Sequence, residues 1–366
     1  MSPDLRNAHL PCALLALLSC GDSTSSTSST GAGAASTTQG SAGGFGASGG
    51  WGGCYTTTDA HCGGGGSASS GGAAGGGGAS STPLFVAVGY GGRRMISTDG
   101  VAWTDDVVVD PMGGDDNNLF RGVGYGNGTF VAVGGSSEGQ IFTSADGVTW
   151  TPRTPGSSWI GDVAFDGGVF IAAGGNGLRQ RSEDLGATWI DQGPYYAGHF
   201  RGIASGDGLV VAAGHTYGQA NNEGLIARSI DLGATWETEL VGGPQYGSIA
   251  FGAGRFVAAG QAGCRSSADG VEWAACGVAG ELGRVVFLND QFLIPDATGL
   301  FVSTDGVTWS HIEGPSRGLT SFGQGIYLAI GWPDRIERST DLASYTVVNQ
   351  DTGPAFTEIV FGTIGP

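Results

Sequence analysis

Seven segments of the chain place a serine, an aspartate and an aromatic residue at nearly constant spacing. Six begin Ser-x-Asp and end in Trp, and the seventh ends in Tyr345. In such a turn the carboxylate accepts backbone N–H bonds, glycine supplies a left-handed backbone, and the indole covers the hairpin. Each aspartate is alone in its segment, whereas a calcium site needs several oxygens at one point. We therefore predict structural turns at Asp99, Asp146, Asp184, Asp231, Asp269, Asp305 and Asp341.

Arginine and aromatic residues in the intervening segments have the chemistry of a ligand site. Arg121 and Arg201 occupy equivalent repeat positions at the start of a strand, and Arg317 lies close to such a start. Guanidinium groups beside exposed aromatic rings suit a carbohydrate or peptide ligand. The alternative is that these are ordinary loop residues. The candidate ligand-binding residues are Arg121, Arg201, Arg317, Trp332, Tyr195, His215 and Tyr217, and the same loops carry Trp159 and His199.

No catalytic constellation stands out. The chain has no Ser-His-Asp elbow, no phosphate-binding loop and no His-x-x-x-His pair. Glycoside hydrolysis needs paired carboxylates, and Asp162 and Glu358 occupy equivalent strand positions but lie two repeats apart. We interpret Asp115 and Asp116 as a solvated loop rather than a calcium site. We expect no cofactor and no metal.

The repeat that holds these residues is built from short strands. The second repeat predicts strands at 121–125, 130–134 and 140–143, and a fourth strand around Trp150. Gly, Asn and Asp turns separate them, and no stretch shows a helical apolar period. Successive turn aspartates lie roughly 36 to 47 positions apart, which is the period of a propeller blade.

The two ends of the repeat region complete each other. Residues 85–89 form a second strand with no first strand before it, and 357–361 form a first strand with no second strand after it. Together they predict one blade, so residues 83–366 should form an all-β, seven-bladed propeller of four-stranded antiparallel blades. The aspartate turns then lie on one rim, and the ligand loops lie on the opposite face.

The turn pattern resembles the BNR/Asp-box repeat of sialidase-like propellers. The full form Ser-x-Asp-x-Gly-x-Thr-Trp occurs at 182–189 and 229–236, and the resemblance covers residues 84–362. It implies the fold but not an activity, because the repeat occurs in sialidases, xyloglucan-cleaving glycosidases, sorting receptors and photosystem assembly factors. The sialidase Arg-Ile-Pro motif is absent, and sialidase propellers have six blades, so no sialidase residue is carried over.

The N-terminal residues have the features of an export signal. Arg6 precedes a short apolar run that ends Leu17-Leu18-Ser19-Cys20. This sequence resembles a bacterial lipobox, which implies a signal peptide at 1–20 and lipidation of Cys20. Ordinary signal cleavage further along is the alternative. Residues 21–82 are rich in Ser, Thr, Gly and Ala, so we expect a disordered tether with a span of ~45 Å.

Four further cysteines form two close pairs. Cys264 and Cys276 flank Gly270 symmetrically, so on antiparallel strands they would be direct neighbours. An exported chain favours disulfides, here Cys264–Cys276 and Cys54–Cys62, over zinc, because neither pair has zinc-ligand spacing.

The composition limits the function classes. The net charge is −18, and the chain has no lysine; such an acidic surface repels nucleic acid. We predict a monomeric propeller that is lipid-anchored in the cell envelope or at the cell surface. It would bind a protein or glycan partner without catalysis. The alternative is a glycoside hydrolase acting on extracellular polysaccharide.

Overall fold

The computed structural model describes residues 81–110, 118–193, 198–217, 223–240, 245–331 and 335–365. All of the described residues belong to one compact unit. Within these ranges no helix is long and apolar enough to cross a membrane. Several predicted features lie outside the described residues: Cys20, the tether, the Cys54–Cys62 pair, Asp115, Asp116, Tyr195 and Trp332.

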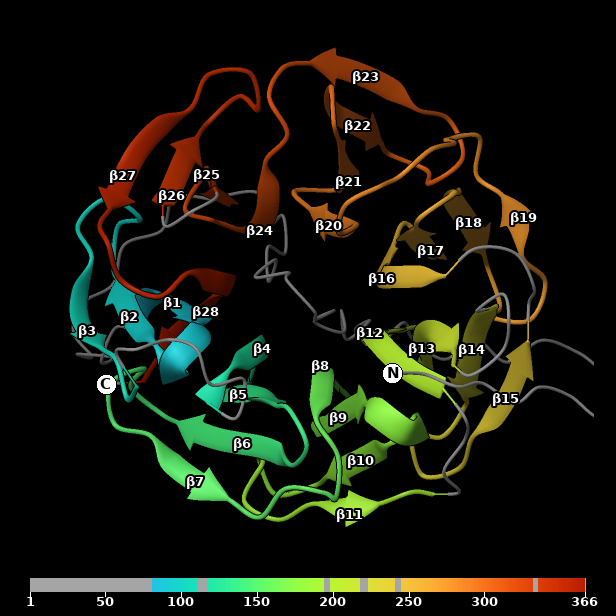
Figure 1. Cartoon of the computed structure of the whole chain (residues 1–366), viewed down its shortest axis with the longest axis horizontal. Coiled ribbons are helices and arrows are strands. Elements are labelled where there is room, and N and C mark those ends of the chain that lie inside the picture. The colour runs from blue at the N-terminus through green and yellow to red at the C-terminus, as the bar shows by residue number, and fades with distance from the viewer. Residues whose placement is uncertain are drawn as a thin grey trace, which may run out of the picture. The chain divides into compact units, whose positions relative to one another are not determined.

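The described residues form seven antiparallel sheets of four strands each, arranged as a ring (Figure 1). This confirms the predicted all-β, seven-bladed propeller. We number the blades along the chain, so that blade one contains the N-terminal strands. The inner strands of blades one to seven, nearest the centre in Figure 1, are β28 (Phe356–Ile364), β4 (Phe120–Gly126), β8 (Ile160–Asp166), β12 (Gly198–Gly206), β16 (Tyr246–Gly252), β20 (Val286–Leu288) and β24 (Gly318–Gly323).

The other three strands of each blade follow outward in chain order. The second strands are β1 (Thr82–Gly89), β5 (Thr129–Gly135), β9 (Val169–Gly174), β13 (Leu209–Thr216), β17 (Arg255–Gly260), β21 (Gln291–Asp296) and β25 (Ile326–Gly331). The third strands are β2 (Arg94–Ser97), β6 (Gly139–Ser144), β10 (Arg179–Ser182), β14 (Gly224–Ser229), β18 (Gly263–Ser267), β22 (Gly299–Ser303) and β26 (Arg335–Ser339). The outer strands are β3 (Thr104–Val107), β7 (Thr151–Arg153), β11 (Ile190–Asp191), β15 (Glu237–Leu240), β19 (Ala274–Ala275), β23 (Ser310–Glu313) and β27 (Thr346–Gln350). Single 3₁₀ turns, η1 (Tyr90–Gly92) and η3 (Gly175–Gly177), follow β1 and β9.

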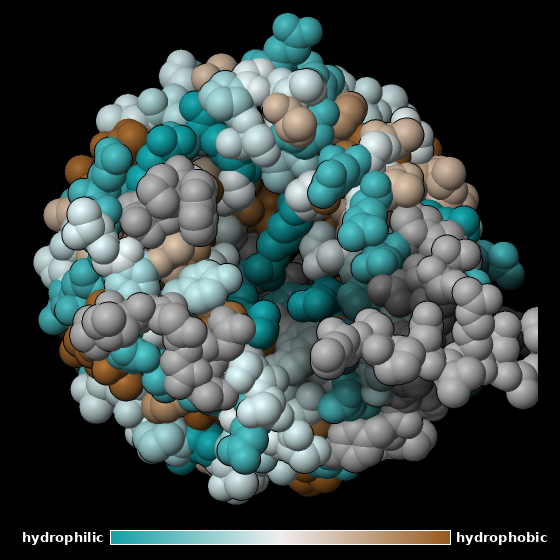
Figure 2. Space-filling view, viewed as in Figure 1, coloured by the Kyte–Doolittle hydropathy of each residue, from teal (hydrophilic) through white to brown (hydrophobic). Residues whose placement is uncertain are grey.

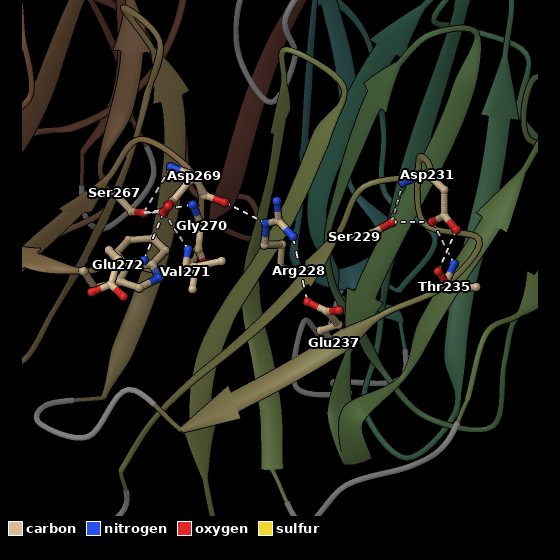
Figure 3. Close-up of polar contacts among 11 residues, drawn as sticks. Arg228, Ser229, Asp231, Thr235, Glu237, Ser267, Asp269, Gly270, Val271 and Glu272 are labelled. Carbon is tan, nitrogen blue, oxygen red and sulfur yellow. Dashed lines mark hydrogen bonds and ion pairs between the residues drawn. The ribbon is translucent and has the colours of Figure 1, made fainter. Parts of the chain in front are cut away.

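The Ser-x-Asp turns connect the third strand of each blade to its outer strand, and hydrogen bonds within each turn stabilise it. In blade one the Ser97 hydroxyl accepts the Gly100 N–H at 2.8 Å, and Asp99 Oδ1 accepts the N–H groups of Val101 and Ala102 at 2.8 and 2.9 Å. In the longer turns a threonine hydroxyl also donates to the carboxylate, as Thr235 does to Asp231 (Figure 3). These bonds explain why serine and aspartate recur in every turn.

Neighbouring blades pack face to face through an aromatic ring and a glycine. A Cβ atom on Gly126 would lie 2.2 Å from the ring of Phe165 in the next blade, so only glycine fits at the end of this inner strand. The same contact joins Gly206 to Phe251 and Gly323 to Phe361. The buried cores therefore lie between blades rather than within them.

The ring closes in blade one, as the sequence predicts. β28 pairs with β1 in antiparallel register, Phe85 lies opposite Phe361, and their ring centroids are 4.7 Å apart. A buried Arg93 reinforces this closure. Its guanidinium donates to both oxygens of Asp106 and of Asp351 and to the Pro354 carbonyl, and it lies 4.2 Å from the centroid of the Phe356 ring. These contacts join strands β2 and β3 to the segment that leads into β28.

Each inner strand except β20 contains a β-bulge near its start. The register with the second strand shifts by one residue at this point in blades one, two, three, four, five and seven. The extra residues are Thr357, Arg121, Gly161, Arg201, Gly247 and Thr320. A bulge redirects the side chain of the extra residue. The side chains of Arg121 and Arg201 therefore depart from the regular alternation between the two faces of the sheet.

One predicted disulfide lies within the described residues. Cys264 is bonded to Cys276 with their Cα atoms 5.5 Å apart. The neighbouring pair, Arg265 and Ala275, sets the antiparallel register that brings the two cysteines together.

Candidate functional site

The two bulge arginines meet over one tryptophan. The guanidinium carbons of Arg121 in blade two and Arg201 in blade four lie 5.0 and 4.8 Å from the ring centroid of Trp159. Trp159 stands directly before β8 in blade three, where the bulge residue is Gly161. A Cβ atom on Gly161 would lie 2.7 Å from the Phe200 carbonyl oxygen and 3.2 Å from the Trp159 ring, so the indole occupies the space of a side chain at this bulge.

An aromatic group continues from Trp159 into blade four. The ring centroid of His199 lies 5.2 Å from that of Trp159 and 5.7 Å from that of His215. The His199 ring is also stacked on the Tyr217 ring, with the centroids 4.8 Å apart and an interplanar angle of 19°. The Asn176 N–H donates to His199 Nδ1, and the Tyr217 hydroxyl lies 3.4 Å from Asn176 Oδ1. Tyr217 remains 42% exposed. We call Arg121, Trp159, His199, Arg201, His215 and Tyr217 the basic-aromatic cluster.

The electrostatics of the basic-aromatic cluster favour an anionic ligand. Burial and the neighbouring charge of Arg121 lower the pKa of Arg201. Burial is the main cause that lowers the pKa of His215 to about 4, and the charges of Arg201 and His199 add to it. Burial and the charge of Arg201 also lower the pKa of His199. Cations that destabilise one another are stabilised when an anion binds between them. This positive group belongs to a chain whose net charge is −18.

Four predicted ligand residues belong to this cluster: Arg121, Arg201, His215 and Tyr217. Arg317 does not join them, because it lies in blade seven, bonds to Glu337 at 2.8 Å and covers the Tyr345 ring at 4.1 Å. The sequence places Trp159 and His199 in the same loops, but it does not distinguish them as ligand residues. Their position in the repeat could have identified them, because each lies two residues before the bulge residue of its inner strand.

A second polar group crosses the central channel one position further along the inner strands. Arg284, just before β20 in blade six, places Nη2 at 2.6 Å from Glu358 in blade one and at 3.3 Å from Asp162 in blade three. Figure 2 shows that the centre of the ring is hollowed and lined by hydrophilic residues. Gly122 lies between the two carboxylates, and a Cβ atom there would be 3.1 Å from Asp162.

Both channel carboxylates also accept backbone N–H groups from the next blade. Glu358 accepts from Val123 at 2.9 Å, and Asp162 accepts from Ile203 at 3.4 Å. Burial raises the pKa of each carboxyl group against the lowering effect of Arg284, and the Asp162 charge raises that of Glu358 further. The Glu358 side chain is fully buried and that of Asp162 is 6% exposed. This geometry links blades one, two, three, four and six, and it leaves little carboxylate surface for a substrate.

No group of three or more His, Cys, Asp or Glu side chains in the described ranges is arranged to hold a metal ion. The basic-aromatic cluster offers nitrogen donors and π faces, which suit an anion or a sugar ring rather than a hard cation.

Comparison with known proteins gives similarity of fold only. No protein family model matches the chain, and no curated protein matches it. Among solved structures, the computationally designed Ika8 protein is similar with a TM-score of 0.48 and 12% identity, over 75% of this chain and 85% of that one. A structure of YCF48 bound to D1 peptide has a TM-score of 0.46 and 18% identity, and the similarity covers 61% of this chain and 78% of that one. A chain of a mitotic checkpoint complex has a TM-score of 0.45 and 12% identity, and the similarity covers 62% of this chain and 78% of that one.

Proposed function

We propose that the chain is a membrane-tethered, extracytoplasmic binding propeller whose partner is a protein or a glycan. The partner docks on the face opposite the Ser-x-Asp turns and places an acidic group on the basic-aromatic cluster. The observation that carries this proposal is the pair of guanidinium groups, Arg121 and Arg201, on one indole.

The chemistry of the basic-aromatic cluster supports an acidic partner. Arginine presents a planar fork of donors that matches a carboxylate or sulfate. A bound anion would also offset the burial and the repulsion from Arg121 that together lower the pKa of Arg201. Trp159 and the His199–Tyr217 stack provide flat faces for a sugar ring or an aromatic side chain.

The remaining parts of the proposal rest on sequence. The chain would be a non-sialidase member of the BNR/Asp-box family, which the bonding of the Ser-x-Asp turns supports. Cys20 would carry the lipid, and residues 21–82 would hold a monomeric propeller near the cell envelope. A flexible tether raises the effective concentration of the propeller for partners close to the membrane.

The channel bears on the alternative of a glycoside hydrolase. Asp162 and Glu358 converge on Arg284, but both are buried and bonded to backbone N–H groups. A hydrolase needs two carboxylates that reach the glycosidic oxygen and a water or sugar carbon. The burial of this pair supports binding over hydrolysis.

The test uses the full chain on an array of acidic and neutral oligosaccharides and peptides, with a hydrolysis screen of the same sugars. We expect saturable binding to acidic probes, without cleavage. Arg121→Ala with Arg201→Ala, and separately Trp159→Ala, should weaken binding at least tenfold. Arg153→Ala is the matched control, since Arg153 lies in β7 and bonds to Thr143 beside the Ser-x-Asp turns. Binding that ignores the charge of the probe, or that survives the double substitution, would contradict the proposal.

A further inference from the structure

The aromatic residue of each Ser-x-Asp turn packs at the junction with the preceding blade. Trp273 packs in the core between blades four and five, and Trp309 in that between blades five and six. In blade seven this position is Tyr345, which packs in the core between blades six and seven. The glycine of the turn is also replaced there, by a buried Leu342 at φ 63°.

The junction between blades four and five shows how an arginine side chain fills this space. Arg228 on β14 donates through Nε to the Asp269 carbonyl at 2.6 Å, and its guanidinium lies 3.8 Å from Glu237 (Figure 3). Its methylene carbons lie against Gly270. The groove beside Ile226, Gly270 and Val271 therefore has no room for a water molecule.

The equivalent place between blades six and seven has smaller residues at two positions. Counting back from the turn serine, Val302 stands where blade four has Arg228, and Tyr345 stands where blade five has Trp273. The three other groove residues correspond to Leu300, Leu342 and Ala343. All three line a pocket of about 120 Å³. Leu342 does not fill the space that the larger residues leave.

The lining of this pocket combines aliphatic side chains with charged groups. Leu300, Ile312, Leu319 and Leu342 supply aliphatic surface, and the rest of the lining includes Tyr345, Arg317 and Glu313. Arg317 is fixed, because it bonds to Glu337 at 2.8 Å and lies 4.1 Å from the Tyr345 ring centroid. An aliphatic floor beside a fixed guanidinium suits a π system, because the cation attracts the ring face.

The pocket volume agrees with a ligand of this kind. An apolar protein cavity of roughly 150 Å³ binds benzene, and this pocket is of similar size. The groove between blades two and three differs, since it is lined by Thr129, Thr143, Asp146 and Asp184, whose hydroxyl and carboxylate groups favour water.

We propose that the pocket between blades six and seven is a second binding site that accepts a planar aromatic ring of phenyl to indole size. It is separate from the basic-aromatic cluster and does not depend on the function proposed for that cluster. The ring can belong to a free small molecule or to an aromatic side chain of a peptide.

The test titrates the full chain with indole, and with the peptides Gly-Trp-Gly and Gly-Leu-Gly, by calorimetry. We expect saturable 1:1 binding of indole and none of Gly-Leu-Gly. Binding of Gly-Trp-Gly would assign the ring to a peptide side chain, and its exclusion would assign it to a free small molecule. Tyr345→Trp, which restores the residue of the other six turns, should weaken indole binding at least tenfold.

Val302→Arg, which repeats the filling seen in blade four, should have the same effect. Thr143→Arg places an arginine at the equivalent position between blades two and three and should leave indole binding unchanged. If Val302→Arg prevents folding, Tyr345→Trp decides alone. Absence of saturable indole binding by the unmodified chain, or equal binding by Tyr345→Trp, would overturn the proposal.

Discussion

Arg93→Ala should measure how strongly the ring closure depends on one buried arginine. The Arg93 side chain is 1% exposed, and its guanidinium donates to both oxygens of Asp106 and of Asp351 and to one carbonyl. Removing one partner of a buried ion pair costs about 3–5 kcal/mol. The two carboxylates are 38% and 35% exposed, so water compensates part of this loss. We therefore expect a loss of about 3 kcal/mol in the free energy of unfolding, close to the lower limit of that range.

Urea unfolding followed by circular dichroism would measure this loss, because the midpoint shifts while the slope stays constant if only stability changes. Arg94→Ala is the matched control. Arg94 is the next residue and begins β2, and its guanidinium carbon lies 5.9 Å from the Phe142 ring centroid, so we expect a loss below about 1 kcal/mol. Replacing Asp106 and Asp351 by Asn in the Arg93→Ala protein should restore part of the stability, because the repulsion between the carboxylates is then removed. An Arg93→Ala protein as stable as the Arg94→Ala control would refute this account of the closure.

Four further predictions follow from the fold and the site. Deleting residues 356–366 removes β28, so we expect loss of cooperative unfolding in a thermal melt; an unchanged melting temperature would show that blade one is stable without it. Replacing Cys264 and Cys276 by Ser should cost about 2–4 kcal/mol by urea unfolding, and a reducing agent should destabilise the unmodified chain equally but leave the variant unchanged. Backbone N–H groups lower the pKa of Asp99, Asp269, Asp305 and Asp341, so their contribution to stability is complete above about pH 4 and is lost as pH falls further; a urea midpoint that stays constant from pH 5 to pH 2 would contradict this. Because the pKa of His215 is about 4, affinity for a sulfated oligosaccharide should rise as pH falls towards 4, and His215→Phe should reduce that rise.

The architecture was predictable because its determinants are local and repeated. Ser97, Asp99 and Gly100 bond to one another within a few residues, so the turn can be recognised without knowledge of the rest of the chain. The ring closure could be deduced from two incomplete repeats, and the pairing of Phe85 with Phe361 confirms it. The Cys264–Cys276 disulfide followed from symmetry about Gly270.

The candidate site was only partly predictable, because it depends on which blades become neighbours across the ring. Arg121 and Arg201 were selected because they break a pattern of small residues, but Trp159 enters the site only through the spatial order of blades two, three and four. Arg284 lies at the repeat position of Asp162 and Glu358, and an alignment of the inner strands would have brought the three together. Arg317 contacts Tyr345 and Glu337, which belong to other segments of the chain, and no local sequence pattern indicates these contacts.

The pairing of β1 with β28 sets an order of events during synthesis. The Thr357 hydroxyl donates to the carbonyl of Val88, and these residues are 269 positions apart. The first strand to emerge must therefore wait, unpaired on one edge, until nearly the whole propeller has been delivered. A nascent chain that stalls before β28 exposes that edge to other strands and to proteases. Quality control could thus distinguish finished from unfinished molecules by whether this single edge is covered.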